Sequence, residues 1–199
     1  MLAVLLISMA YCLGCCNTGY YLVRWLRATD IRTLASGGTG SRNVGRLLGL
    51  KGFALTLLGD GGKGALAVWT TLHSTGDLPL ALASLLAVVA GHIWPAQLGF
   101  RGGKGMAAFA GGMLVIMPIT LLGGLLMSAV ISPIVWGSTK AGLLVLAFSP
   151  LLAAWEVSRL GVRPLSLELG LYCLLVAIVL FAHRENIGNA LTELKKQSF

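Results

Sequence analysis

The stretch ASGGTGSRNVGR (35–46) concentrates groups that bind phosphate within an otherwise apolar chain. Its glycines allow positive φ angles, so that several backbone N–H groups can turn toward one point. Arg42 and Arg46 add forked donors that match phosphate oxygens. The remaining side-chain donors are Ser36, Thr39, Ser41 and Asn43. The stretch predicts an anion site, although an interfacial loop whose arginines bind lipid head groups explains the same residues equally well.

A second polar cluster, LLGDGGKGALAVW, places Asp60 and Lys63 between apolar residues. Ionisable groups in such a position are costly, and they are usually paired or functional. On a helix their i,i+3 spacing would let them neutralise each other. Both a structural ion pair and a functional lysine therefore fit the pattern.

A third cluster, GHIWPAQLGFRGGKGMAAFAGG, surrounds Lys104 with Gly102, Gly103 and Gly105. A glycine turn that opens a helix presents N–H groups and a positive dipole end to an anion. It is not a nucleotide-binding P-loop, because Leu98 and Gly105 stand where that motif needs glycine and a hydroxyl residue. The cluster predicts a second anion site.

Two of the three histidines accompany these clusters. His183 follows the last apolar segment in AHRENIGNAL and would share a helical face with Asn186, although a plain juxtamembrane helix explains this cluster as well. His92 ends an earlier apolar segment. It is either part of the glycine-turn site or a structural histidine bonded to a backbone carbonyl.

Composition indicates that membrane helices must position these clusters. Of the 199 residues, 56% are hydrophobic and 11% are charged, and the mean hydropathy is +0.85; these values are typical of multi-span helical membrane proteins. Segment 106–136 is too long for one crossing, and Pro118 and Gly123-Gly124 indicate a turn near its middle. The other apolar segments are 2–23, 52–72, 79–98, 141–158 and 167–182. We therefore expect an all-α polytopic protein with about seven transmembrane helices and one domain, residues 1–199.

The basic residues predict the orientation. With seven spans and the N-terminus outside, all 15 Lys and Arg except Arg159 and Arg163 fall on the cytoplasmic side, as the positive-inside rule favours. The C-terminus is then cytoplasmic, and the polar clusters converge on the cytoplasmic face. This favours catalysis at an interface over a membrane transporter of a phosphorylated small molecule, which needs polar groups near the midplane.

Four stretches, in this order, carry a resemblance to one family: ATDIRTLASGGTGSRNVGRLLG, GDGGKGALAVW, GHIWPAQLGFRGGKGMAAFAGG and HRENI. From Gly14 to about Leu194, the chain resembles the bacterial acyl-phosphate:glycerol-3-phosphate acyltransferases. The resemblance implies an enzyme of the bacterial inner membrane that transfers a fatty acyl group from acyl phosphate to the 1-hydroxyl of glycerol 3-phosphate. Lysophosphatidic acid and phosphate are the products, in the first acylation of phospholipid synthesis.

The resemblance also implies site residues and partners. By motif position, the catalytic residues are His183, Asn186 and Lys104, with His183 as the base unless the substrate phosphate accepts the proton. The residues that bind phosphate and substrate are Ser36, Gly40, Arg42, Asn43, Arg46, Lys63, Gly102, Gly103 and Gly105, and Asp60 and His92 support them. The partners are the two substrates and membrane lipids. We expect no cofactor, no metal, no nucleic acid and no required protein partner.

Two departures from the family pattern concern the acceptor. Gly38-Thr39 and Ser41-Arg42 replace the inner pairs of the first motif, which in the family commonly reads Ser-Gly-Asn-Pro-Gly-Ala-Thr-Asn. The family's Arg-Tyr-x-Ser-Leu-x-Ser turn is replaced by GSTKAGLLVL, with Ser138, Thr139 and Lys140 as partial substitutes. A divergent paralogue that acylates another acceptor is therefore the alternative.

Overall fold

The computed structural model describes residues 1–135, 137–159 and 166–197, and every regular element in these ranges is helical. The expected all-α class is therefore confirmed for the described part of the chain. Two compact units divide the chain, Met1–Ile116 and Met117–Phe199, and each is described by itself. Arg163, expected on the outer side, lies outside the described residues.

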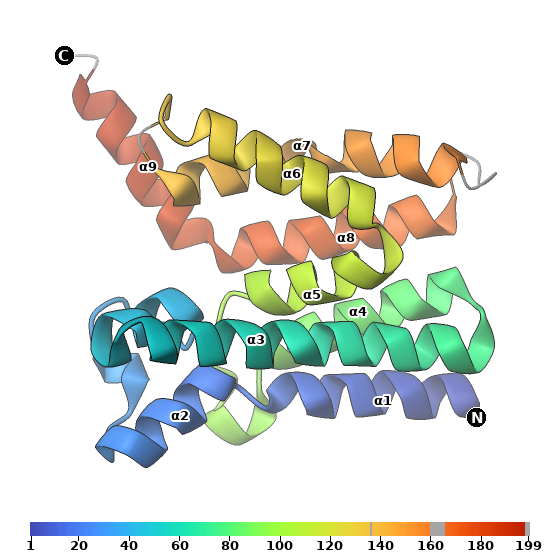
Figure 1. The fold of residues 1–199 in the computed structure, drawn as a ribbon, viewed down its shortest axis with the longest axis horizontal. Helices are drawn as coiled ribbons and strands as arrows, with labels where there is room; N and C mark the ends of the chain where they lie inside the picture. The colour runs from blue at the N-terminus through green and yellow to red at the C-terminus, as the bar shows by residue number, and fades with distance from the viewer. Residues whose placement is uncertain (136, 160–165, 198–199) are drawn as a thin grey trace. The chain divides into compact units, whose positions relative to one another are not determined.

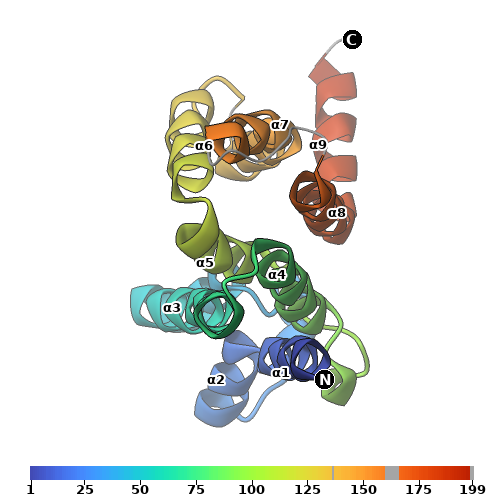
Figure 2. The same cartoon turned by 90° about the vertical axis from the view of Figure 1, so that its right-hand side faces the viewer.

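The first unit consists of five α-helices and two short 3-10 helices. They are α1 (Leu2–Cys15), α2 (Thr18–Arg27), η1 (Ile31–Thr33), α3 (Ser41–Thr75), α4 (Leu78–Ile93), η2 (Ala96–Leu98) and α5 (Met106–Ile116). Helices α1 and α3 lie along nearly the same axis but run in opposite directions in Figure 1, and both are seen end-on in Figure 2. α4 packs against α1, and α3 packs against both α4 and α5. Gly49, with a φ of 68°, interrupts α3 and separates its first turns from the long apolar part.

Close contacts between backbones hold this unit together. Gly14 of α1 lies against the carbonyl oxygen of Val88 in α4, and Gly64 of α3 lies against that of Ala108 in α5. A Cβ atom at either glycine would collide with that carbonyl. Small residues permit such approaches in membranes, where helix association depends on van der Waals packing. Part of the high glycine content therefore serves packing rather than chemistry.

The second unit contains α6 (Pro118–Ile131), α7 (Ser138–Arg159), α8 (Leu167–Ala182) and α9 (Arg184–Gln197). The buried carboxylate of Glu156 in α7 accepts hydrogen bonds from the backbone N–H groups of Ile119 (3.3 Å) and Thr120 (2.6 Å). A carboxylate at this position satisfies unpaired donors at the start of α6 and complements the helix dipole. α9 bends by 64° from α8.

By length and composition, three described helical stretches are suited to crossing a membrane: Leu2–Arg27, Leu78–Leu98 and Ser138–Arg159. The bent pair α8 and α9 is a fourth candidate. The expected turn within segment 106–136 falls at Met117 and Pro118, whereas Gly123-Gly124 lies inside α6. α5 has 11 residues and α6 has 14, so each is shorter than the hydrocarbon layer of about 30 Å.

Candidate active site

Asn43, in the first turn of α3, shapes the first polar loop. Its amide nitrogen donates to the carbonyls of Leu34 (3.2 Å) and Gly38 (2.9 Å), while its Oδ1 accepts from the backbone N–H of Ser36 at 3.4 Å. Gly40 is the N-cap residue of α3. The side chain of Asn43 therefore contributes to this region by closing the loop on the start of the helix.

An apolar cluster joins the helices on either side of this loop. Val23 of α2, Ile31 of η1 and Val44 of α3 are completely buried against one another. The side chains of Arg42 and Arg46 remain exposed on α3. The loop thus combines an apolar base with two exposed cations, as an interfacial anion site requires.

A buried polar link joins the loop to the end of α4. The hydroxyl of Thr39 donates to Oδ1 of Asn17 at 2.8 Å. The amide nitrogen of Asn17 donates to the backbone carbonyl of His92 at 3.3 Å. Because Asn17 and Thr39 are completely buried, these bonds replace water for both side chains. They hold the first polar loop against His92, near the start of the third cluster.

The second cluster forms a buried charge network. The ammonium of Lys63 lies 3.0 Å from Oδ1 of Asp60 and 2.8 Å from Nδ1 of His92. It also donates to the carbonyls of Gly14 and Cys16, each at 2.9 Å. Lys63 is 5% exposed and Asp60 is 1% exposed. The expected contact between Lys63 and a substrate phosphate does not fit this burial, because protein groups already surround the ammonium.

The glycine turn is held by the same residue, His92. The backbone N–H of Gly103 donates to the His92 carbonyl and that of Gly102 to the Ile93 carbonyl, each at 3.0 Å. A Cβ atom at Gly103 would collide with Nε2 of His92. Gly105, with a φ of 81°, then leads into α5. His92 therefore connects the buried Asp60–Lys63 pair to the turn that carries the half-buried Lys104.

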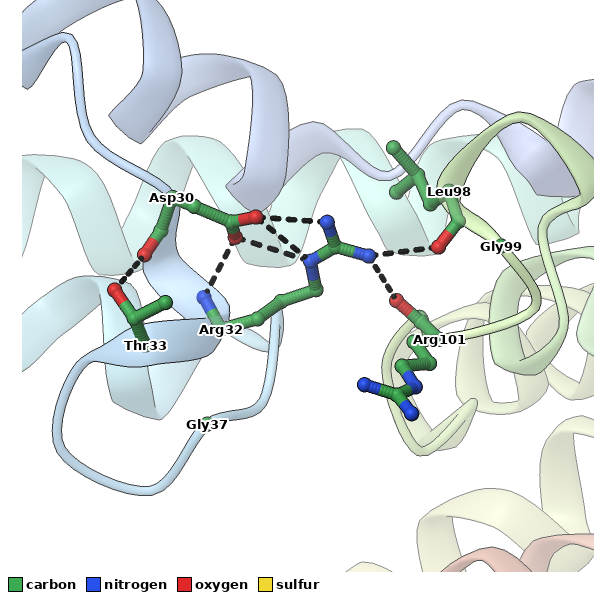
Figure 3. A pocket seen from close by; sticks show the side chains of 8 residues that line it. Asp30, Arg32, Thr33, Gly37, Leu98, Gly99 and Arg101 are labelled. Atoms are coloured by element: carbon green, nitrogen blue, oxygen red, sulfur yellow. Dashed lines mark hydrogen bonds and ion pairs between the residues drawn. The ribbon is translucent and has the colours of Figure 1, made fainter.

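A cavity of about 580 Å³ lies between the segment 30–37, which contains η1 and the start of the first polar loop, and the 98–102 turn. Arg32 lies on its wall and donates through Nη1 to the carbonyls of Leu98 (2.7 Å) and Arg101 (3.4 Å). The same guanidinium forms a forked pair with Asp30, with Nη2 lying 2.7 Å from Oδ2 (Figure 3). These bonds to Arg32 lower the pKa of the Asp30 carboxyl, and the carboxylate in turn raises the pKa of the Arg32 guanidinium. The charged pair of Asp30 and Arg32 thus joins η1 to the 98–102 turn.

His183 and Asn186 belong to the second unit, at the junction of α8 and α9. His183 is buried, and its Nδ1 lies 2.8 Å from the carbonyl oxygen of Val179. Since a carbonyl only accepts, Nδ1 carries the proton and the lone pair of the neutral ring is on Nε2. This tautomer suits a base that acts through Nε2.

The chain has clear relatives. The family model described as glycerol-3-phosphate acyltransferase matches residues 4–193. The chain belongs to the glycerol-3-phosphate acyltransferase family. The protein named glycerol-3-phosphate acyltransferase 1 in Desulfitobacterium hafniense (strain Y51) is 42% identical over 97% of this chain and 93% of its own length. The glycerol-3-phosphate acyltransferase of Clostridioides difficile (strain 630) is 35% identical over 94% of this chain and 91% of its own length.

Solved structures agree with this membership. The crystal structure of PlsY (YgiH), an integral membrane glycerol 3-phosphate acyltransferase, in its glycerol 3-phosphate form matches with a TM-score of 0.85 and 29% identity. The match covers 97% of this chain and 94% of that one. The lysophosphatidic acid form matches with a TM-score of 0.81, at 28% identity. The expected family and the expected kind of enzyme, an acyltransferase, are thereby confirmed.

The structure also shows polar residues to which the sequence analysis gave no site role. Asn17 and Arg32 bond to segments distant in the chain, and Asp30 pairs with Arg32; Asp30 and Arg32 stand in ATDIRT, before the glycines of the first loop. A usable signal was the single amide inside the apolar segment 2–23, in the case of Asn17, and the two opposite charges in ATDIRT, in the case of Asp30 and Arg32. Among the described residues, no three His, Cys, Asp or Glu side chains gather as a metal site requires.

Proposed function

We propose that this chain transfers a fatty acyl group from acyl phosphate to glycerol 3-phosphate at the cytoplasmic face of the bacterial inner membrane. The observation that carries the proposal is the match, over 97% of the chain, to a membrane acyltransferase solved in its glycerol 3-phosphate form. The two polar loops, each rich in backbone donors and cations, supply what a reaction between two phosphorylated substrates requires.

The reaction needs one new bond and one broken bond. The 1-hydroxyl oxygen of glycerol 3-phosphate attacks the acyl carbon, and the bond from that carbon to the phosphate oxygen breaks. Phosphate leaves with the bonding electrons, and the hydroxyl proton passes to a base. Because phosphate is a good leaving group, the site needs to orient the acceptor and stabilise the oxyanion rather than form a covalent acyl-enzyme.

The residues fall into four groups in this proposal. Phosphate is held by the first loop, through donors from Ser36, Gly40, Arg42 and Arg46, with Asn43 fixing the loop. Lys104 and the backbone N–H groups of the turn 102–105 face the second phosphate or the oxyanion. His183 takes the proton and Asn186 orients the glycerol hydroxyl. Asp60, Lys63 and His92 support the glycine turn from within the helical unit, in keeping with their burial.

The membrane arrangement is part of the proposal. Seven crossings, with the N-terminus outside and the C-terminus cytoplasmic, leave Arg24, Arg27, Arg32 and Lys104 on one side, as expected from positive-inside bias. A family model that extends from residue 4 to residue 193 spans both compact units. This supports one functional domain over residues 1–199.

A two-substrate assay tests the function. Purified protein in detergent or lipid is given palmitoyl phosphate and glycerol 3-phosphate, and both phosphate release and lysophosphatidic acid are followed, with palmitoyl-CoA as a parallel donor. We expect phosphate release that depends on the acceptor and equals the lipid formed, with no turnover of palmitoyl-CoA.

Three other outcomes would change or reject the proposal. Turnover of acyl phosphate with a different acceptor only would retain the chemistry and reject glycerol 3-phosphate, as the altered first motif allows. Turnover with palmitoyl-CoA but not with palmitoyl phosphate would reject the donor. Absence of turnover with every donor and acceptor, in folded protein, would reject the acyltransferase proposal for this chain.

A further inference from the structure

The cavity between the segment 30–37 and the 98–102 turn contains a cation to which the proposed function gives no task. Arg101 lines the cavity together with Arg32, Asp30 and Thr33. Figure 3 shows its side chain extending from the turn into the space between the two loops. We propose that this cavity is a subsite for a phosphate monoester, in which Arg101 contacts the anion and Arg32 positions Arg101. The inference rests on the proposed function and assigns part of its substrate binding.

The charge balance of the cavity favours an anion. Asp30 and Arg32 neutralise each other through their forked pair. Among the residues that the structure describes, the Arg101 side chain has neither an ion pair nor a hydrogen bond, and it is exposed. The wall therefore carries one uncompensated positive charge. A guanidinium binds a phosphate group through two parallel N–H donors.

Arg32 fixes the place of this cation. It donates to the carbonyl of Arg101 itself and to that of Leu98, three residues earlier. The Arg32 guanidinium lies over the ring of Tyr20, 5.1 Å from its centroid, which adds a further contact. Arg32 is thus already committed to protein groups. Its effect on a ligand acts through the backbone that carries Arg101, which makes Arg32 a positioning residue.

The cavity has the room and the position for a small polyol phosphate or the phosphate end of an acyl phosphate. Its volume of about 580 Å³ exceeds that of either group, and glycines at 37, 99 and 102 leave its wall open. Arg101 and Lys104 stand on either side of Gly102-Gly103 in the chain. One anion at Arg101 and another at Lys104 would place the two phosphates of the reaction at the two ends of the Gly102-Gly103 step in the chain.

Replacing Arg101 tests the subsite. We expect Arg101→Gln to raise the KM for one substrate about ten-fold, with kcat changed less than about two-fold, because one charge-assisted contact to phosphate is lost. Arg101→Lys, which retains the charge, is expected to recover most of the affinity. Arg27→Gln is the matched control: it removes an exposed arginine at the end of α2, away from the cavity lining. The assay also shows which substrate supplies the bound phosphate. A higher KM for glycerol 3-phosphate assigns the subsite to the acceptor, and a higher KM for acyl phosphate assigns it to the donor.

A binding measurement separates this inference from the proposed function. Inorganic phosphate is titrated into the detergent-purified protein by calorimetry in a buffer free of phosphate, and Arg101→Gln is expected to weaken binding about ten-fold while Arg27→Gln leaves it unchanged. This result is accessible even if no acyl transfer is found. Normal KM values for both substrates together with normal phosphate affinity in Arg101→Gln would overturn the subsite while leaving the acyltransferase proposal intact.

A double-variant cycle tests the positioning role. Arg32→Lys keeps the charge but loses the forked guanidinium. We expect it to raise the KM of the same substrate whose KM Arg101→Gln raises. If Arg32 acts through Arg101, the double variant shows little further increase. Effects that multiply would show that Arg32 acts independently of Arg101 and would overturn the positioning role.

Discussion

The ammonium of Lys63 lies 2.8 Å from Nδ1 of His92, so that the second and third polar clusters meet inside the first helical unit. Asp60 supplies the balancing charge, and the His92 carbonyl accepts from the N–H of Gly103. A buried ion pair contributes little net stability compared with apolar residues, but removal of one partner leaves an uncompensated charge. The ammonium of Lys63, which the sequence assigned to a phosphate, is thus enclosed by protein groups beside the histidine whose carbonyl holds the glycine turn.

We expect Lys63→Met to destabilise the protein by about 3 kcal/mol, because Asp60 remains buried without its cation. Thermal unfolding in detergent measures this as a lower midpoint. Lys51→Met, which removes an exposed lysine from the same helix, is the control and is expected to have little effect. The double variant Asp60→Asn/Lys63→Met should be less destabilised than Lys63→Met. Equal midpoints for Lys63→Met and Lys51→Met would contradict a structural network.

Gly64 and Gly62 offer a second matched comparison, within α3. A Cβ atom at Gly64 meets the Ala108 carbonyl, whereas a Cβ atom at Gly62 meets nothing within 4 Å. We expect Gly64→Ala to lower the unfolding midpoint, because α3 and α5 must separate at a cost of about 1–3 kcal/mol. Gly62→Ala should leave the midpoint unchanged or raise it, because alanine favours the helix. If both variants unfold alike, close packing at Gly64 is not what stabilises this pair of helices.

The pair of Asp30 and Arg32 predicts a pH dependence. Folding lowers the pKa of the Asp30 carboxyl below its ordinary value of 3.8, chiefly through the hydrogen bonds from Arg32. The stabilisation is therefore present above about pH 4 and is lost as the pH falls through the lowered pKa. We expect Asp30→Asn to lower the free energy of unfolding at pH 7 by less than about 1 kcal/mol, because the pair is part-exposed. The difference from the original protein should shrink below pH 4, and a difference independent of pH would argue against this pair as its cause.

Local signals in the sequence predicted much of the helical framework. Pro118 correctly indicated where segment 106–136 divides, because proline is favoured in the first turn of a helix and disfavoured further inside. The break at Cys16 and Asn17, inside the apolar segment 2–23, was not predicted. Nothing local requires it, since the side chain of Asn17 finds its partners in Thr39 and in the His92 carbonyl, 22 and 75 residues away.

The sequence predicted which residues belong to the candidate site better than it predicted the contacts between them. The glycine turn stands where its motif placed it, but the first loop ends at Gly40, because Ser41–Arg46 form the first turns of α3, and of the glycines in 35–46 only Gly37 has a positive φ. The position of Lys63 depends on how the end of α1 packs beside α3 and α4, which no spacing within its own stretch encodes. The bond from Arg32 to the Leu98 carbonyl likewise spans 66 residues.

Lys104 and Ser138 should differ sharply in their effect on turnover. We expect Lys104→Ala to lower kcat by at least about 100-fold, because the proposed stabilisation of the second phosphate or the oxyanion is lost. Ser138→Ala should cost less than about ten-fold, because that serine only partly replaces the family's missing motif. Phosphate release and lysophosphatidic acid formation measure both, with unfolding midpoints to show equal folding. Comparable activity of Lys104→Ala and the original protein would remove the core of this mechanism.

Replacement of His183 tests which group accepts the hydroxyl proton. Its Nδ1 is committed to the Val179 carbonyl, so that a base acting through Nε2 is already in the required tautomer. If His183 is the base, His183→Gln should lower kcat about 100-fold or more, as loss of general-base catalysis does. His73→Gln, which changes an exposed histidine on α3, is the control and should retain full activity. If His183→Gln instead costs less than about ten-fold in folded protein, the phosphate of a substrate must accept the proton. His183 would then serve only to orient the acceptor, which a change in KM without a comparable change in kcat would reveal.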